Sequence, residues 1–171
     1  MRRAGYGASR ALAAALWLAI AAAALAANEP VVEQGGARTR WLESMPTREV
    51  VVDTGEARHA FKAWVASTPW QKARGLMHVH SLEPDRGMLF LLGQPQYASF
   101  WMRDTYISLD LLFIDEQGRV VNIIERAEPL TTTPLLSTAP VTLVLEILAG
   151  TSERLGIRAG HRVEIGEPAA E

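Results

Sequence analysis

The chain has 171 residues, of which 49% are hydrophobic and 21% are charged, and its formal net charge is −2. These values suit one ordinary globular domain with short extensions and exclude collagen, a coiled coil and a long disordered polymer. Cysteine is absent, so the chain forms no disulfide and carries no lipid-modified cysteine. Its folded state must be stabilised by packing alone.

The N-terminus has the pattern of a secretory signal peptide. Three arginines within the first ten residues precede an apolar run over 11–25, and Ala24-Leu25-Ala26 forms a small-x-small cleavage pattern. The run is short and alanine-rich for a membrane span, so we expect cleavage and no stable membrane span afterwards. An uncleaved anchor is the alternative. Export behind this segment predicts a periplasmic or secreted protein.

Cleavage would change the charge of the mature protein. It removes three of the 17 basic residues and none of the 19 acidic ones, which moves the net charge to about −5. A surface with this balance does not attract polyanions, so we predict no nucleic-acid partner.

Composition divides the rest of the chain into three parts. Residues 27–47 contain Gly35-Gly36 and mixed charges without a clear period, which is typical of a flexible linker. Residues 48–166 have a β-rich pattern, and 167–171 form a short polar tail.

The β-rich domain begins with two strands and a short helix. Thr68-Pro69-Trp70-Gln71 is typical of a helix start, because Thr68 can cap the helix, Pro69 fits its first position and Gln71 can reach back. The helix should end near Gly75. A Gly93–Pro95 turn separates two later strands, and residues 152–155 form a second helical turn. The expected strands are 49–53, 59–66, 87–92, 96–102, 106–114, 119–125, 141–148 and 161–165.

About eight short strands with one or two short helices, and no βαβ rhythm, predict a mainly β fold. We expect a single compact antiparallel β-sandwich or flattened barrel.

Two carboxylates fall on strand faces that are otherwise apolar. Alternation over 107–113 puts Asp110 on the same side as Leu112 and Ile114. Glu146 likewise shares a side with apolar neighbours in the 141–148 strand. A buried carboxylate needs an ion pair, hydrogen bonds or a raised pKa. The candidate partners are Arg74, Arg86 and Arg103.

These carboxylates allow different roles. Asp110 and Glu146 could share a cleft as a catalytic acid and base, or hold a polar ligand passively. They could instead form structural ion pairs that fix the strand register, or be exposed.

Trp101 and Arg103 point to the same side if their segment is extended. An aromatic face beside a guanidinium suits sugars, carboxylates and peptide ends. The alternative places Trp101 in the core and Arg103 in a salt bridge. His78 and His80 share one side as well, but they lack a third metal ligand and are weak metal candidates. Cofactor motifs such as glycine-rich phosphate loops are absent, so we predict no cofactor.

Five motifs follow one another along the chain: "RGLM" (74–77), "GMLF" (87–90), "FWMRDTYISLDLLFIDEQG" (100–118), "VLEILAG" (144–150) and "LGIRAGHRV" (155–163). In this order they resemble the prokaryotic family known as domain of unknown function 192 (DUF192, also uncharacterised protein family 0127). The resemblance covers about residues 50–165 and implies a compact, mostly β domain that is often exported, with no agreed activity. The sequence departs from the family at Asp104, where asparagine is usual, and at Ser108, His78, His80 and His161.

Two functions therefore remain open. The first is a non-catalytic binding or accessory domain of the cell envelope, whose partner is a small polar ligand or an envelope protein. The second is an envelope hydrolase or lyase that uses Asp110 and Glu146 as acid and base. The predicted ligand-binding residues are Arg74, Trp101, Arg103, Asp104, Asp110 and Glu146.

Overall fold

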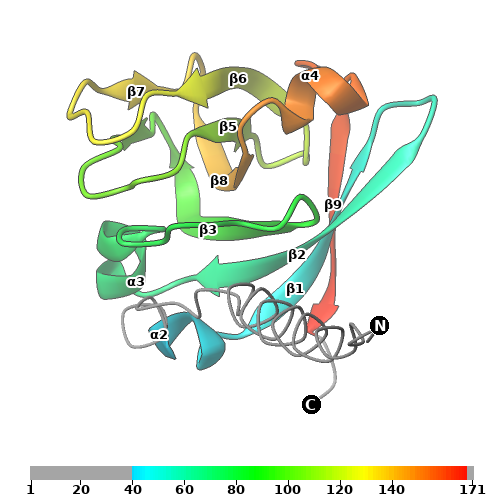
Figure 1. Cartoon of the computed structure of the whole chain (residues 1–171). Helices are drawn as coiled ribbons and strands as arrows, with labels where there is room; N and C mark the ends of the chain where they lie inside the picture. Colours follow the sequence, from blue (N-terminus) through cyan, green and yellow to red (C-terminus); the bar gives the residue numbers. More distant parts are fainter. Residues whose placement is uncertain (1–39, 169–171) are drawn as a thin grey trace, which may run out of the picture. The chain divides into compact units, whose positions relative to one another are not determined.

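The computed structural model describes residues 40–168 (Figure 1). The predicted signal peptide (1–26), most of the predicted linker and the end of the tail lie outside the described residues. Within the described residues, no helix is long and apolar enough to cross a membrane.

The described part of the chain forms nine strands and three short helices. In chain order they are α2 (Arg40–Glu43), β1 (Thr47–Asp53), β2 (Arg58–Ala66), α3 (Pro69–Arg74), β3 (Arg86–Gln96), β4 (Ser99–Phe100), β5 (Leu109–Ile114), β6 (Val120–Ala127), β7 (Leu135–Leu136), β8 (Val141–Leu148), α4 (Thr151–Leu155) and β9 (Arg162–Pro168).

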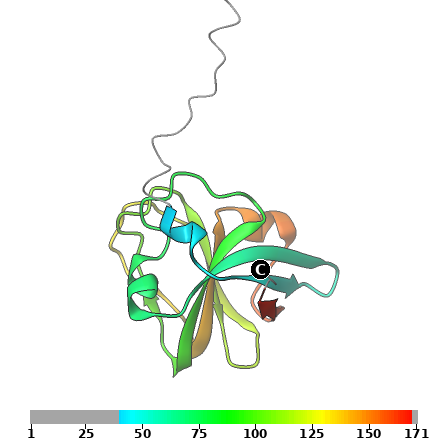
Figure 2. The same ribbon diagram turned by 90° about the horizontal axis from the view of Figure 1, so that it is seen from below.

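Seven strands form one sheet in the order β6-β5-β8-β3-β2-β1-β9, and β4 pairs with β7 in a small second sheet. The large sheet curls into a half-barrel, as Figure 1 and Figure 2 show from two directions. Its outermost strands meet at one end, where Arg119 bridges to Arg162 and the Val120 amide donates to the His161 carbonyl over 2.9 Å. The predicted mainly β fold is confirmed. The sheet is mixed rather than purely antiparallel, because β2 and β3 run parallel.

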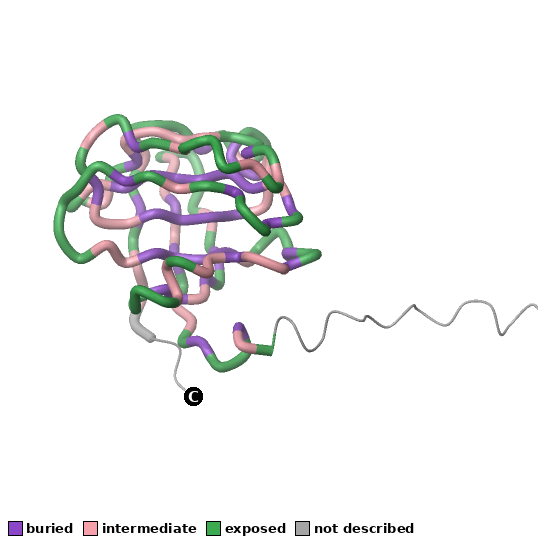
Figure 3. The backbone as a smooth tube through the Cα atoms, turned by 90° about the vertical axis from the view of Figure 1, so that its left-hand side faces the viewer, coloured by how far each residue is buried: buried purple, intermediate pink, exposed green. Residues whose placement is uncertain are grey.

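The central strands are buried on both faces. All six residues of β5 are buried, which explains why its sequence is apolar on both sides apart from Asp110. One face packs inside the half-barrel around Phe61, Leu89 and Leu112. The other face packs under α2, α3 and the long connections, around Met88, Phe90 and Phe113. Figure 3 shows the buried positions along the strands and the exposed ones mainly at turns and loops.

The predicted helix start is confirmed at α3. The Thr68 side chain accepts a hydrogen bond from the Gln71 amide, and the Gln71 side chain accepts one from the Thr68 amide. Gly75 ends the helix with a φ of +50°. A Cβ at that position would make only an ordinary contact with the Phe90 ring, at 3.4 Å, so the positive φ is what favours glycine there.

Three sequence predictions of local structure are wrong. Gly93–Pro95 does not separate two strands, because β3 continues through it to Gln96. Of the strand predicted over 96–102, only Ser99–Phe100 forms a separate strand, β4. The register of β3 against β8 shifts between Leu91 and Gln96, and such an irregularity tolerates a proline. Residues 40–47, predicted as the end of a flexible linker, belong to the fold, since they form α2 and bury Leu42.

Candidate functional site

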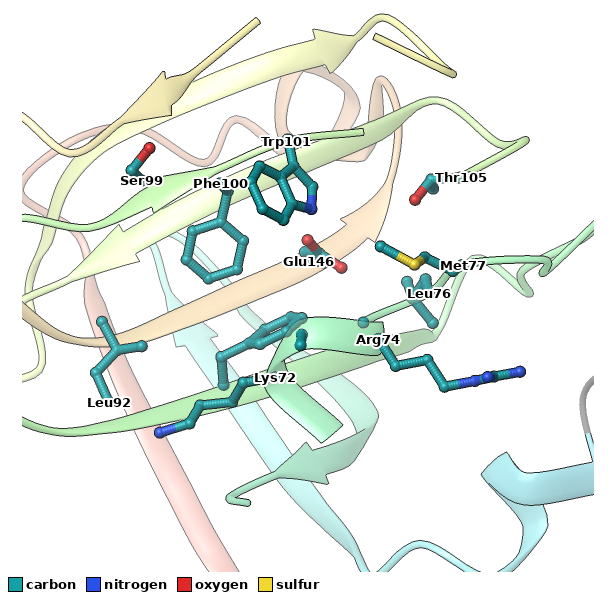
Figure 4. Close-up of a pocket in the computed structure, with 13 residues that line it drawn as sticks. Lys72, Arg74, Leu76, Met77, Leu92, Ser99, Phe100, Trp101, Thr105 and Glu146 are labelled. Atoms are coloured by element: carbon teal, nitrogen blue, oxygen red, sulfur yellow. The ribbon is translucent and has the colours of Figure 1, made fainter. Parts of the chain in front are cut away.

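A cavity of about 240 Å³ lies over the outer face of β3 and β8. Its cover comes from α3 with the residues that follow it and from the connection between β4 and β5. Figure 4 shows the side chains from these segments around Glu146. The lining residues are Lys72, Ala73, Arg74, Gly75, Leu76, Met77, Phe90, Leu92, Ser99, Phe100, Trp101, Thr105 and Glu146.

Glu146 forms the floor of this cavity. It stands on β8 opposite Met88 of β3 and Leu111 of β5, so its side chain points to the outer face of the sheet with theirs. Only 4% of its surface is exposed, and its Oε2 atom has no hydrogen-bond partner within residues 40–168. Burial raises the pKa of Glu146 to about 8, so the carboxyl is mostly protonated at neutral pH.

Aromatic rings form one wall of the cavity. The Phe100 ring packs edge-on against Phe90, with 5.0 Å between ring centroids, and against Phe113 at 6.1 Å. Trp101 stands at the mouth and is 47% exposed. In Figure 4 the side chains of Phe100 and Trp101 extend toward Glu146, and Met77 approaches from another side. The interior is therefore mostly apolar around a single buried carboxyl.

The two cationic residues of the lining point away from this carboxyl (Figure 4). Lys72 donates from its Nζ to the Leu91 carbonyl over 3.1 Å. The guanidinium of Arg74 lies over the rings of Trp41 and Trp70, 4.9 and 5.5 Å from their centroids. Both cations thus belong to the outer edge of the cavity.

Asp110 lies elsewhere. It pairs with Ile147 on β8, and its side chain points to the face inside the half-barrel, opposite to that of Glu146. Its carboxylate accepts three backbone hydrogen bonds, from the amides of Arg126 (2.9 Å), Gly150 (3.0 Å) and Ser152 (2.9 Å). The predicted acid/base pair in a shared cleft is not formed. Asp110 instead fastens the turn that leads into α4.

Comparison with known proteins identifies the family. The model of DUF192, described as "Uncharacterized ACR", matches residues 50–165. The chain belongs to the DUF192 family. No curated protein matches the chain.

Two solved structures are similar to this chain in sequence and in fold. A protein of unknown function from Novosphingobium aromaticivorans is 42% identical and has a TM-score of 0.68, and the match covers 69% of this chain and 84% of that one. A protein from Sinorhizobium meliloti, described as a "putative transcription regulator", is 37% identical with a TM-score of 0.70, and the match covers 71% and 95% of the two chains.

The structure of this DUF192 domain brings together only some of the predicted ligand-binding residues. Arg74, Trp101 and Glu146 line the cavity, and Arg103 and Asp104 lie next to it in the chain. Arg103 lies over the Trp101 ring, 4.5 Å from its centroid, and no salt bridge of Arg103 is found within the described residues. The alternative with Trp101 in the core is therefore wrong.

Sequence reasoning missed several lining residues, among them Lys72, Met77, Phe100 and Thr105. Met77 and Phe100 belong to the motifs "RGLM" and "FWMRD", which carried the family resemblance. Those motifs marked the residues but did not reveal that the segments meet over the same face of the sheet.

His78 and His80 both pack against Tyr106. The His78 Nδ1 atom lies 3.4 Å from the Tyr106 hydroxyl, and the His80 ring centroid is 4.8 Å from that of Tyr106. Across residues 40–168, no group of three or more histidine or acidic residues could hold a metal ion.

Proposed function

We propose that this DUF192 domain binds a small organic ligand in the cavity over Glu146 and does not transform it chemically. The observation that carries the proposal is the unpaired Oε2 atom of Glu146, buried at the floor of an open cavity. A buried polar atom without a partner costs about 1–3 kcal/mol, and a ligand that supplied the missing contact would recover this energy. The neighbouring residues on the same face of the sheet, Met88 and Leu111, are apolar, so the glutamate is the exception there.

The size and lining of the cavity define the ligand class. A volume of about 240 Å³ is slightly below the usual range of roughly 300–1,000 Å³ for small-molecule sites. Aromatic walls around one polar group favour a compact molecule with an apolar body and one polar group.

The enzyme alternative has weaker support. Acid/base catalysis with two carboxyls needs both groups within reach of the same substrate. Asp110 faces the half-barrel interior and its oxygens are occupied by three backbone amides. Glu146 would have to act alone.

A protein partner is the second candidate, supported by exposed apolar side chains on α3, on β7 and in the connections that follow β3 and β6. Tyr97 is 71% exposed, and Trp70, Leu130 and Leu136 are also largely exposed. Such exposure favours an envelope protein as a partner of an accessory domain. We propose no nucleic-acid partner, because the net charge of −2 gives no electrostatic attraction to phosphates.

We also propose export to the periplasm or the medium, with cleavage after residue 26. Expression of the full chain in a Gram-negative host and intact-mass analysis of the periplasmic fraction tests this. A mass that begins at Ala27 supports cleavage. Retention of the whole chain in the membrane fraction would instead indicate an anchor.

A fragment screen by two-dimensional NMR tests ligand binding directly. We expect hits to shift the indole resonance of Trp101 and to bind at least tenfold more weakly to Trp101→Ala. Tyr97→Ala is the matched control, because it removes an exposed aromatic ring that does not line the cavity. A screen without hits, or hits equally affected by both substitutions, would refute the proposal.

A further inference from the structure

We propose that the cavity over Glu146 binds a cationic group, such as an ammonium or quaternary ammonium, between the Glu146 carboxylate and the aromatic wall. This inference rests on the proposed function and names the ligand chemistry. It uses the side chains that Figure 4 shows around Glu146.

The first support is the combination of rings with a carboxyl group. Phe90, Phe100 and Trp101 all line the cavity that has Glu146 at its floor. The faces of aromatic rings carry partial negative charge and attract cations within about 6 Å, most strongly when water is excluded. Trp101 already attracts one cation, since Arg103, which does not line the cavity, lies over its ring 4.5 Å from the centroid.

The second support is that the domain's own charged groups leave this carboxyl unpaired. On α3, Lys72 bonds to a backbone carbonyl and Arg74 lies over Trp41 and Trp70. Other charged groups on the elements packed around Glu146 also have other neighbours: Arg86 on β3 lies over Trp64, Arg103 lies over Trp101, and Asp110 lies on the opposite face of β5. Asp104, in the same connection as Arg103, is exposed. In the segment that follows α3, His78 and His80 pack against Tyr106, and Glu83 and Asp85 are exposed.

No salt bridge within the described residues includes Glu146. A cation carried by a ligand would therefore supply the missing counter-ion. Because the carboxyl is desolvated, its attraction to such a cation is stronger than it would be at the surface.

A neutral Glu146 offers a different mode, in which its O–H donates a hydrogen bond to a carbonyl or hydroxyl oxygen of an uncharged ligand. The two modes differ in the proton. A cation favours the ionised carboxylate, so binding releases a proton from Glu146 to the buffer. An uncharged acceptor retains that proton.

Proton release makes the affinity for a cation depend on pH. Burial raises the pKa of Glu146 to about 8 in the free protein. Below that value, the dissociation constant of a permanent cation should rise about tenfold for each unit that the pH falls, and above it the constant should level off. A ligand that accepts a hydrogen bond should show the opposite trend and weaken above pH 8.

The experiment compares cations with neutral molecules of the same shape. Choline and 3,3-dimethyl-1-butanol form one pair, and tetramethylammonium and neopentane-derived alcohols extend the panel. Titration of the full chain by calorimetry between pH 6 and 9 gives the dissociation constants. We expect choline to bind at least tenfold more tightly than its neutral counterpart at pH 8.5, with the predicted slope below pH 8.

Glu146→Gln keeps the shape of the side chain and removes its charge. We expect this variant to lose the preference for choline and the pH slope while it still binds neutral fragments. Glu128→Gln, an exposed glutamate outside the cavity, is the matched control and should leave both unchanged within about twofold. Circular dichroism checks that each variant is folded.

The outcomes separate the two proposals. If neutral fragments bind the cavity but no cation of the panel binds better than its neutral counterpart at pH 8.5, the cationic inference is overturned and the ligand site stands. If neither cations nor neutral fragments bind, the proposed function fails as well.

Discussion

Asp110 and Glu146 lie on adjacent strands, but their side chains point to opposite faces of the sheet. Asp110 stands opposite Ile147 and Glu146 opposite Leu111, so the two positions differ by one residue in register. Since side chains alternate along a strand, this single step separates them completely. Asp110 therefore binds the connection that leads into α4, whereas Glu146 faces the cavity beside α3.

Asp110→Asn should destabilise the domain by about 2–4 kcal/mol. The carboxylate accepts hydrogen bonds from three backbone amides at 2.9–3.0 Å, and an asparagine would turn an NH₂ group toward at least one of them. Hydrogen bonds to a charged group contribute more than neutral ones, and a buried amide without an acceptor costs about 1–3 kcal/mol. Urea denaturation measures the loss.

Ser152→Ala is the matched control for this prediction. It retains the Ser152 amide that donates to Asp110 and removes only a buried hydroxyl that has no hydrogen-bond partner in the described structure. We expect a change within about 1 kcal/mol. If Asp110→Asn changed the free energy of unfolding as little as Ser152→Ala does, the hydrogen bonds of Asp110 would not be what stabilises the turn into α4.

The sequence could predict that Asp110 is buried but not what it binds. Alternation in the 107–113 strand marks the position correctly, and every residue of β5 is buried. The sequence predicts arginine partners, because charged side chains can be recognised from residue type alone. The actual partners are backbone amides of Arg126, Gly150 and Ser152, which every residue except proline possesses and no sequence pattern distinguishes.

The cavity was harder to predict for a related reason. The faces of β8 followed from alternation, but the location of Glu146 depends on which distant segments cover that face. Residues 72–77 and 99–105 meet there only through the sheet order, in which β8 lies between β5 and β3. Local patterns give elements and faces, whereas long-range pairing decides which side chains share a cavity.

Glu146→Gln should stabilise the domain increasingly as the pH rises. Burial raises the pKa of Glu146 from its ordinary value of 4.5 to about 8. Between these values the folded protein holds a proton that the unfolded chain has lost, so the free energy of unfolding of the wild type falls with pH. This loss of wild-type stability is absent below pH 4.5 and complete above pH 8. The free energy of unfolding falls by at most on the order of 5 kcal/mol in total.

Denaturation at pH 5 and at pH 8.5 gives the free energies of unfolding of Glu146→Gln and of the wild type. The effect is the change, between the two pH values, in the difference between variant and wild type. The gap between Glu146→Gln and the wild type should widen at the higher pH, whereas Glu128→Gln should show no such change. A gap that stays constant across this range would mean that Glu146 ionises in the folded protein much as it does in the unfolded chain.

Gly87→Ala should destabilise the domain by about 3 kcal/mol or more. A Cβ at this position would lie 2.5 Å from the backbone oxygen of Glu146, closer than atoms can approach, and both groups are fixed in paired strands. Overpacking in a core costs about 1–3 kcal/mol even when side chains can adjust, and backbone has less freedom. Thermal unfolding of Gly87→Ala and of the control Gly166→Ala tests this. At Gly166 the nearest atom would be 3.4 Å away, so near-wild-type stability is expected.

Leu42→Ala should lower the free energy of unfolding by about 2–3 kcal/mol, because α2 is part of the domain rather than of a linker. Leu42 is buried in the outer core, and the neighbouring Trp41 ring packs edge-on against Trp70 at 5.7 Å. Removing a buried leucine side chain costs about 2–5 kcal/mol, with the lower values where the site can collapse, as it can at this peripheral helix. Glu43→Ala, on the exposed side of the same helix, should change stability by less than about 0.5 kcal/mol.

A chain that begins at residue 48 should likewise unfold at lower urea concentration than one that begins at residue 40. Equal midpoints for these two chains would show that α2 contributes nothing to the fold.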